Sequence, residues 1–288
     1  EKVLSKARPE IVFHLAAQPL VKKAYEDPLY TFQTNAFGSL NLLESIKRYN
    51  QVKSLVMITS DKVYENVEWL WGYREIDRLG GYDPYSASKS MAEIGINSYV
   101  KSFFSNCKTK VATARAGNVI GGGDWALDRI VPDCMKAWSK NKNVIIRNPR
   151  STRPWQHVLE PLSGYLLLGK ILYQNNDLHG ESFNFGPSTS ENFSVKDLIN
   201  RMSQNLDNFS FKVKKDSSLK EAKLLQLNCD KATNVLKWQP VLDFNDTVDF
   251  TTDWYREYYN KSSKMRDFSI LQIEDYYKKA KLKKLSWS

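Results

Sequence analysis

The chain has 288 residues, of which 42% are hydrophobic and 26% are charged, and its formal net charge at pH 7 is +10. This length fits one large α/β domain, or a domain with a smaller lobe, and the composition excludes wholesale disorder. No apolar run is long enough to cross a bilayer, and the three cysteines and three histidines are scattered without a CxxC pair. We therefore expect a cytoplasmic protein without a signal peptide, a disulfide framework or a metal site.

The positive charge is concentrated in two segments. Between Asp133 and Glu160 there is no acidic residue, and the basic residues there are Lys136, Lys140, Lys142, Arg147, Arg150 and Arg153. The turn-rich run "RNPRSTRPW" is suited to holding a small polyanion, whereas a nucleic-acid duplex requires a long basic stripe. From Lys261 onward eight bases face three acids, and "KKAKLKKLSWS" is typical of a solvated, fraying end. The pattern favours a small anionic ligand over nucleic acid.

The first 117 residues alternate between apolar runs and helical stretches. The runs "EIVFHLAA" (10–17), "SLVMIT" and "KVATARA" (110–116) predict strands, with a helical stretch through about residue 48 and a helix starting just after Pro84. This order predicts βαβ units in a parallel, doubly wound sheet of the Rossmann-like α/β class, which binds ligands beyond the carboxyl ends of its strands. "EKVLSKARPE" resembles the end of a helix that leads into a strand, so we expect the fold to begin upstream of Glu1.

The pattern loosens beyond residue 117. "VIIRN", "QHVLE", "SFNFG" and "FKVKK" predict short strands, and 194–205 and 245–259 predict helices. We interpret 1–117 as a partial dinucleotide-binding domain and 118–260 mainly as a mixed α/β substrate lobe whose chain crosses back to the sheet. Residues 261–288 are expected to form a basic helical tail.

The segment "GGGDWA" (121–126) matches the dinucleotide pattern G-x-G-x-x-A, but we reject it as a pyrophosphate loop. Four residues separate it from the preceding strand, Asp124 would face the phosphate, and the next predicted strand ends on Arg147 instead of an acid. A flexible loop over a substrate fits better.

Tyr85 and Lys89 form a Y-x-x-x-K pattern at the start of a helix. Residues four apart lie on one helical face, where an ammonium group would lower the pKa of the phenol so that tyrosinate acts as a base. A surface pair is the usual explanation of so short a pattern. Here the strand "LVMITSDK" lies about twenty-five residues upstream and ends on Asp61 and Lys62, which favours the catalytic interpretation over a simple salt bridge.

Several segments together carry a family resemblance: "HLAAQP", "TSDKVYEN", "GYDPYSASK", "TARAGNVIGGGDWALDRIVPD", "NPRSTRPWQHVLEPLSGYLLL" and "NFGP". Up to about residue 275 the chain resembles the extended short-chain dehydrogenase/reductase superfamily, in its nucleotide-sugar dehydratase/epimerase branch. Within that branch it is most similar to the 4,6-dehydratases that act on CDP-glucose, which carry "TSDK". The family pattern also implies a first strand and a glycine-rich loop that this sequence does not contain.

The resemblance implies an NAD-dependent reaction that converts CDP-glucose to CDP-4-keto-6-deoxyglucose. Tyr85, steered by Lys89, would take the C4 hydroxyl proton during oxidation of C4, and Ser60 would hydrogen-bond the C4 oxygen. Asp61 would protonate the departing C6 hydroxyl while Lys62 removes the C5 proton, before the hydride returns to C6. These roles require burial to raise the pKa of Asp61 and lower that of Lys62.

The resemblance also assigns binding residues. The cofactor residues would be Leu15, Ala16, Ala17 and Thr59, together with Tyr85 and Lys89. The substrate residues would be Asn118, Arg129, Arg153 and Asn184, with Arg153 on the nucleotide diphosphate. The partner is a CDP-sugar, with no nucleic acid and no membrane, and a homodimer is expected. Deoxysugar supply to surface polysaccharide such as O-antigen would be the pathway.

Two alternatives stay open. One is another nucleotide-sugar epimerase or dehydratase, which would be distinguished by its product. The other is an inactive binding fragment, because a chain without the glycine-rich loop is expected to bind NAD poorly and to be inactive alone.

Overall fold

A computed structural model describes residues 1–146, 148–175, 177–188, 192–213, 224–261 and 264–288. Arg147, the expected end of one strand, lies outside these residues, as does the end of "FKVKK".

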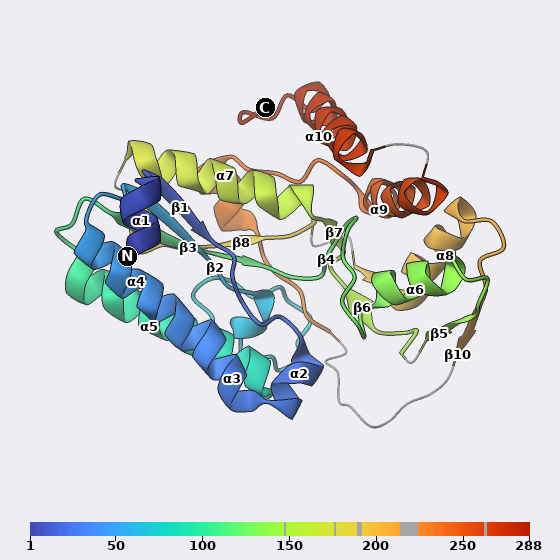
Figure 1. Cartoon of the computed structure of the whole chain (residues 1–288), viewed down its shortest axis with the longest axis horizontal. Helices are drawn as coiled ribbons and strands as arrows, with labels where there is room; N and C mark the ends of the chain where they lie inside the picture. The colour runs from blue at the N-terminus through green and yellow to red at the C-terminus, as the bar shows by residue number, and fades with distance from the viewer. Residues whose placement is uncertain (147, 176, 189–191, 214–223, 262–263) are drawn as a thin grey trace.

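A parallel four-stranded sheet organises the larger part of the molecule (Figure 1). Its order is β1-β2-β3-β8, from β1 (Ile11–His14), β2 (Ser54–Ile58), β3 (Lys110–Ala116) and β8 (Ser182–Phe185). β2 and β3 are almost entirely buried, as expected for central strands covered on both faces, whereas the edge strand β1 is only partly covered. The predicted α/β fold with a parallel sheet is confirmed.

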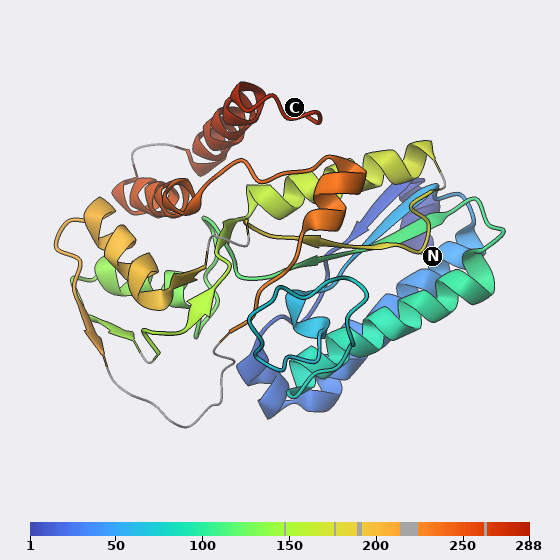
Figure 2. The same ribbon diagram turned by 180° about the vertical axis from the view of Figure 1, so that it is seen from behind.

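Helices cover both faces of this sheet (Figures 1 and 2). One face carries α4 (Gly38–Tyr49) and α5 (Pro84–Tyr99), whose side chains share a core cluster with Leu55, Met57 and Val111. The other face carries α7 (Leu159–Gln174), which shares a cluster with Val56 and Phe183. The helices around them are α1 (Lys2–Ala7), α2 (Val21–Glu26), α3 (Pro28–Phe32) and the π-helical turns η1 (Gln33–Phe37) and η3 (Val100–Phe104). The sequence predicted one helical stretch where α2, α3, η1 and α4 follow one another.

A smaller part stands at the carboxyl end of the sheet, to the right in Figure 1. Its helices are α6 (Ile130–Trp138), α8 (Val195–Asn205) and α9 (Phe244–Asn260). Its strands are β4 (Val119–Ile120), β5 (Val144–Ile146), β6 (Thr152–Arg153), β7 (Gln156–His157), β9 (Phe193–Ser194) and β10 (Phe211–Val213). One core cluster joins α6, α8, α9, β4 and β5, and Met135, Ile199 and Tyr255 are fully buried in it.

Two sequence predictions are corrected here. "QHVLE" is a strand only at Gln156 and His157, because α7 begins at Leu159. The basic end does not fray: α10 (Met265–Leu282) buries Tyr276 and Ala280 against the segment around Val241. The hydroxyl of Tyr276 donates to the buried carboxyl of Glu160, so the lysines of this helix lie on a docked element.

The loop 121–126 is packed and not loose. Gly122 lies against the indole of Trp254, and Trp125 contacts the rings of Trp254 and Tyr255 on α9. The π-helical turn η4 (Ala232–Leu236) packs with α7 on the same face of the sheet.

Candidate active site

The segment that follows β2 lies at the carboxyl edge of the sheet, between two neighbouring strands. β2 pairs with β1 and β3, and the backbone N–H of Thr59 still bonds to Ala114 on β3. The chain then enters the short 3-10 turn η2 (Asp61–Val63), capped by Ser60, whose hydroxyl accepts from the N–H of Lys62 at 3.2 Å. The acid and the amine therefore stand where open α/β sheets bind ligands.

α5 brings Tyr85 and Lys89 to this edge. The helix begins at Pro84 because Asp83 caps it, accepting from the N–H of Ser86 at 3.0 Å. Tyr85 is 7% exposed, and burial raises its pKa to about 12, opposed by a hydrogen bond with Ser60 and by the charge of Arg129. The expected low pKa of this phenol is therefore wrong for the chain by itself, because desolvation outweighs the neighbouring positive charge.

Asp61 is the most deeply buried of the predicted catalytic groups, with 2% exposure. The hydroxyl of Ser60 donates to Oδ1 at 3.0 Å, whereas Oδ2 is buried and has no hydrogen-bond partner among the described residues. Burial raises the pKa of Asp61, and the charges of Lys62 and Arg153 oppose that shift. The direction is the one that the sequence analysis expected, and it favours a carboxyl that carries a proton.

The two lysines differ in their surroundings. Lys62 is only partly buried, so its surroundings differ from the buried site that the sequence analysis required for a neutral amine. Lys89 is 6% exposed, and burial lowers its pKa to about 8 against the opposing charge of Glu93. Its ammonium makes no hydrogen bond or ion pair with any residue that the structure describes.

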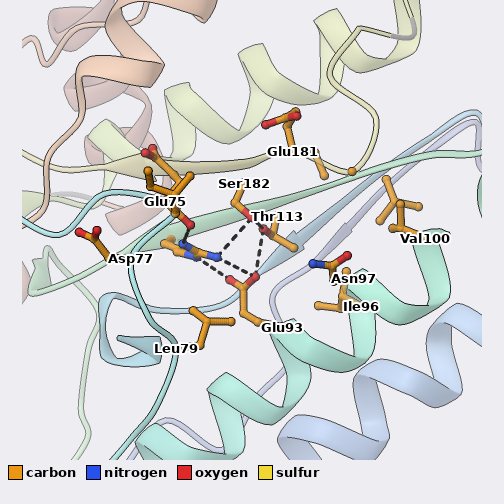
Figure 3. Close-up of a pocket in the computed structure, with 15 residues that line it drawn as sticks. Glu75, Asp77, Leu79, Glu93, Ile96, Asn97, Val100, Thr113, Glu181 and Ser182 are labelled. Carbon is orange, nitrogen blue, oxygen red and sulfur yellow. Dashed lines mark hydrogen bonds and ion pairs between the residues drawn. The ribbon is translucent and has the colours of Figure 1, made fainter. Parts of the chain in front are cut away.

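A buried ion pair that the sequence analysis missed supports both flanks of the Ser60–Lys62 segment. Glu93, on α5, receives two bonds from Arg115 on β3, of 2.8 and 3.1 Å (Figure 3). Glu93 also accepts from the hydroxyl of Thr59, and Arg115 donates to the hydroxyl of Tyr64 at 2.8 Å. Thr59 and Tyr64 flank the segment, so one ion pair fixes it from both sides. No local pattern marks this pair, because its two residues are 22 positions apart in the sequence and lie on different elements.

The predicted substrate residue Asn184 belongs to the same network. Its side chain is fully buried, accepts from Tyr64 at 2.7 Å, and donates to the carbonyl oxygens of Tyr73 and Asn228. All these partners are protein groups, so its substrate role stays a prediction.

A cavity of about 230 Å³ lies beside this network, and Figure 3 shows the side chains that line it. Its lining includes Glu75, Glu93, Thr113, Arg115 and Ser182, and it includes none of the residues predicted to touch the substrate or the cofactor.

Two arginines of the smaller part, Arg129 and Arg153, affect the pKa values of the buried groups at the end of the sheet. Arg129 is bonded to Asp124 at 2.8 Å, and its charge reaches the phenol of Tyr85. Arg153, on β6, is partly buried, and its charge reaches the carboxyl of Asp61. Asn118, in a left-handed conformation with φ of 49°, carries the chain from β3 to β4. The structure thus brings these three residues toward the end of the sheet.

The predicted cofactor residues after β1 lie at the sheet edge. Leu15 is 52% exposed, and Ala16 and Ala17 follow it at the surface. The next residue, Gln18, is buried and its N–H donates to Asn35 at 2.8 Å, while Asn35 donates to Ser88 on α5. These two buried amides, which the sequence analysis missed, tie the loop to the helix that carries Tyr85 and Lys89.

Two further observations concern ligands and membranes. No group of three or more His, Cys, Asp or Glu among the described residues could hold a metal ion. Within the same residues, no helix has both the length and the apolar character required to span a bilayer.

Comparisons with known proteins agree with this geometry. Residues 1–251 match the family described as GDP-mannose 4,6 dehydratase. CDP-glucose 4,6-dehydratase of Salmonella typhimurium is 43% identical over 279 residues, which cover 95% of this chain and 77% of that protein. UDP-glucose 4-epimerase of Mycoplasma pneumoniae is 25% identical over 90% of this chain and 79% of its own length.

Solved structures share the fold. An epimerase from Methanothermobacter thermautotrophicus superposes with a TM-score of 0.79 at 22% identity, covering 91% of this chain and 77% of that chain. dTDP-glucose 4,6-dehydratase from Bacillus anthracis, in complex with NAD, gives 0.72 at 20% identity, covering 89% and 75%. Because the family match spans most of the sequence and the Salmonella relative is 43% identical, the chain belongs to the GDP-mannose 4,6 dehydratase family.

Proposed function

We propose that this protein is an NAD-dependent hydro-lyase that converts CDP-glucose to CDP-4-keto-6-deoxyglucose. The observation that carries the proposal is the buried, partly unpaired carboxyl of Asp61, which lies with Ser60 and Tyr85 at the carboxyl end of the sheet. A carboxyl held in this way is suited to donate a proton, which an epimerase does not require. The choice of CDP-glucose rests on the similarity to the Salmonella enzyme.

The residues present fit NAD. Lys89 is 6% exposed, and its side chain makes no hydrogen bond within the described residues. Leu15 and Ala16 are exposed just beyond strand β1, and Ala17 after them is partly buried. We assign Leu15–Ala17 to contacts with the cofactor and Lys89 to hydrogen bonds with its ribose hydroxyls. Thr59 is assigned to a position behind the nicotinamide ribose. When bound, NAD supplies an acceptor for the hydride of C4 and a donor of that hydride to C6.

Tyr85 and Ser60 serve the first step. The phenolate of Tyr85 removes the proton of the C4 hydroxyl, and the hydroxyl of Ser60 hydrogen-bonds the same oxygen. Because burial raises the pKa of Tyr85, a positive charge must be close when the substrate is bound. We assign this charge to Arg129, which already lowers the pKa of the phenol, and to Lys89, four residues along the same helix.

Asp61 and Lys62 serve the second step. Once C4 is a ketone, the neighbouring C5 proton is acidic, and the amine of Lys62 removes it. The resulting ammonium of Lys62 returns a proton to C5 when C6 receives its hydride. Asp61, whose pKa is raised by burial, donates a proton to the C6 hydroxyl as that group leaves. The partial exposure of Lys62 supports a base on the substrate side, and the burial of Asp61 supports an acid on the protein side.

The smaller part holds the nucleotide. Arg153 is assigned to the diphosphate, Arg129 and Asn118 to the sugar and its neighbouring oxygens, and Asn184 to positioning of the strand beneath them. Residues 118–260 are proposed mainly as the substrate lobe, with the chain crossing back to the sheet, 1–117 as the cofactor part and 261–288 as the basic tail. Two core clusters support this division, since one joins residues 120–259 and another residues 4–111, while a third packs α7, β8 and η4 together at the sheet.

We further propose a homodimer in the cytoplasm. Large apolar side chains are exposed along α3, η1, α5 and η3, which suits a helical interface between two copies. They are Leu29, Tyr30, Phe37, Met91, Ile94 and Phe103. The three cysteines are free, which suits a reducing compartment. The keto sugar would feed deoxysugar synthesis for surface polysaccharide.

The product of the reaction tests the function. Kinetic work uses the full-length enzyme. Incubation with CDP-glucose and NAD should yield a 4-keto-6-deoxy sugar, seen by its absorbance in alkali and by a methyl signal in NMR. A simple C4 epimer as product would overturn the assignment in favour of an epimerase.

A further inference from the structure

Gly117 lies directly after β3 and is buried beside the proposed acid. Its backbone does not require glycine, since among the described glycines only Gly123 and Gly180 have a positive φ. The reason for a glycine at this position must therefore be the space that its missing side chain leaves.

The carboxyl of Asp61 occupies that space. A Cβ atom added to Gly117 would lie 2.8 Å from Oδ1 of Asp61 and closer still to Cγ and Oδ2. These three atoms are the nearest neighbours of such a Cβ, so a methyl group would collide first with the carboxyl group. Real Cβ atoms do not approach other atoms so closely, and one of the two groups would have to move.

The Asp61 side chain has little freedom to move and remain in place. Oδ1 accepts from Ser60, and the backbone of Asp61 is part of the turn η2. Thr59 and Tyr64, on either side of that turn, are held by Glu93 and Arg115. A methyl group on Gly117 would therefore rotate the carboxyl out of its buried position and would leave the turn where it is.

We propose that Gly117 is a positioning and specificity-determining residue, whose absent side chain forms the seat in which Asp61 is held as the proton donor of the elimination step. This inference rests on the proposed function. It implies that a residue with a Cβ at position 117 leaves the oxidation of C4 and the removal of the C5 proton intact. Such an enzyme would retain the 6-hydroxyl of its substrate.

The test is Gly117→Ala in the intact enzyme. Wild-type-like rates are expected for nicotinamide reduction and for exchange of the C5 proton with deuterated solvent, whereas formation of the deoxy sugar should fall about 10²–10³-fold, as for loss of a general acid. Gly186→Ala is the matched control: Gly186 directly follows β8 as Gly117 follows β3, and an added Cβ there would make only an ordinary 3.4 Å contact with Cys229. It should form product at the wild-type rate. A wild-type rate of product formation in Gly117→Ala would overturn the proposal.

A double variant shows whether Gly117 acts through Asp61. Asp61→Asn combined with Gly117→Ala should be no slower than Asp61→Asn alone, because the function of the seat is already lost. Multiplying effects would mean that Gly117 acts on something else. If Asp61→Asn alone dehydrates at the wild-type rate, the proposed acid is wrong, and this outcome is distinct from a failure of the seat.

Two measurements do not depend on turnover. Carbon-13 NMR of labelled aspartate, assigned by comparison with Asp61→Asn, should show the raised pKa of Asp61 in the wild type and a lower one in Gly117→Ala, where the carboxyl reaches water. Thermal unfolding should show that Gly117→Ala destabilises the wild type but not the Asp61→Ala background, where the space is empty. Equal destabilisation in both backgrounds would contradict the seat, even if the single variant folds poorly.

Discussion

The reacting groups and the nucleotide-binding groups lie in different physical surroundings. Tyr85, Lys89 and Asp61 are all less than 10% exposed and stand on a sheet and helix that form one packed body. The side chain of Arg129 is 39% exposed, and Arg153 is partly buried on a two-residue strand. Acid and base chemistry requires desolvation to move pKa values, whereas capture of a charged ligand requires donors that reach water. The molecule separates the two requirements between its two parts.

The largest loss of rate is expected from a substitution of Tyr85, one of the buried reacting groups. Tyr85→Phe removes the base for the C4 hydroxyl and should lower the rate of nicotinamide reduction by about 10⁴-fold, at the upper end for a lost general base. Absorbance of the reduced cofactor after mixing with CDP-glucose measures it. Tyr165→Phe is the control, since this buried tyrosine lies close enough for Asp61 and Tyr85 to raise its pKa but has no assigned role. A wild-type burst of reduced cofactor in Tyr85→Phe would contradict the assignment.

The next largest effects should separate the two members of the pair. Lys62→Met keeps the length of the side chain without the amine, so it should still reduce the cofactor but fail to exchange the C5 proton with deuterated solvent. Asp61→Asn should still reduce the cofactor and exchange the C5 proton. It should release water slowly, because an amide does not donate a proton to the departing C6 hydroxyl. Each loss should be about 10²–10⁴-fold.

An ordinary salt bridge between these two residues would give a different result. All three steps would slow alike, and the free energy of unfolding would fall. Normal deuterium incorporation at C5 in Lys62→Met would rule out the role of that lysine.

Substitutions in the nucleotide-binding part should change KM instead of kcat. Arg153→Ala should raise KM for the CDP-sugar about ten- to a thousand-fold, on the scale of a lost charged partner of about 2–4 kcal/mol. Arg153→Lys should restore little of it, since an ammonium lacks the bidentate geometry of a guanidinium. Arg150→Ala, an exposed neighbour in the same segment, serves as the control. An unchanged KM in Arg153→Ala would place the diphosphate elsewhere.

The smallest expected effect is a shift in pH dependence. Burial lowers the pKa of Lys89 to about 8, so kcat/KM should fall as the pH rises above that value and the ammonium loses its charge. Glu93 raises the same pKa, and Glu93→Gln should therefore move this alkaline limb to lower pH. The pH profile of kcat/KM measures the shift, and Glu181→Gln, at an exposed acid, is the control. If the alkaline limb of the profile does not move in Glu93→Gln, the ionisation of Lys89 does not cause that limb.

Sequence patterns predicted the elements that depend on local order. The strand 110–116, the helix at Pro84 and the acid that ends β2 follow from apolar runs, a cap and helical spacing. Contacts between distant residues had no such signal. Glu93 and Arg115 are 22 residues apart, and Tyr64 and Asn184 are 120 apart, so their bonds depend on how the strands align.

The same limit explains two of the wrong predictions. The lysine-rich end reads as solvated by composition, but Tyr276 and Ala280 dock on partners far upstream in the chain. Tyr85 reads as an acidic phenol beside Lys89, but the packing around it, which no spacing reveals, raises its pKa. Gly117 gave no signal either, because a glycine after a strand is ordinary until its neighbour is known.

The hydroxyl of Ser60 has a consequence for how the enzyme returns to its starting state. In the proposed reaction, Tyr85 ends with one proton more than it began with, and Asp61 ends with one fewer. Ser60 lies between them: its hydroxyl is 3.0 Å from Oδ1 of Asp61 and forms the hydrogen bond that lowers the pKa of Tyr85. A hydroxyl that accepts from one neighbour while donating to the other passes a proton along without becoming charged. If the proposed roles hold, the proton taken from the sugar's C4 oxygen has a path to the carboxyl that protonates the departing hydroxyl, and the site would reset without drawing a proton from the solvent.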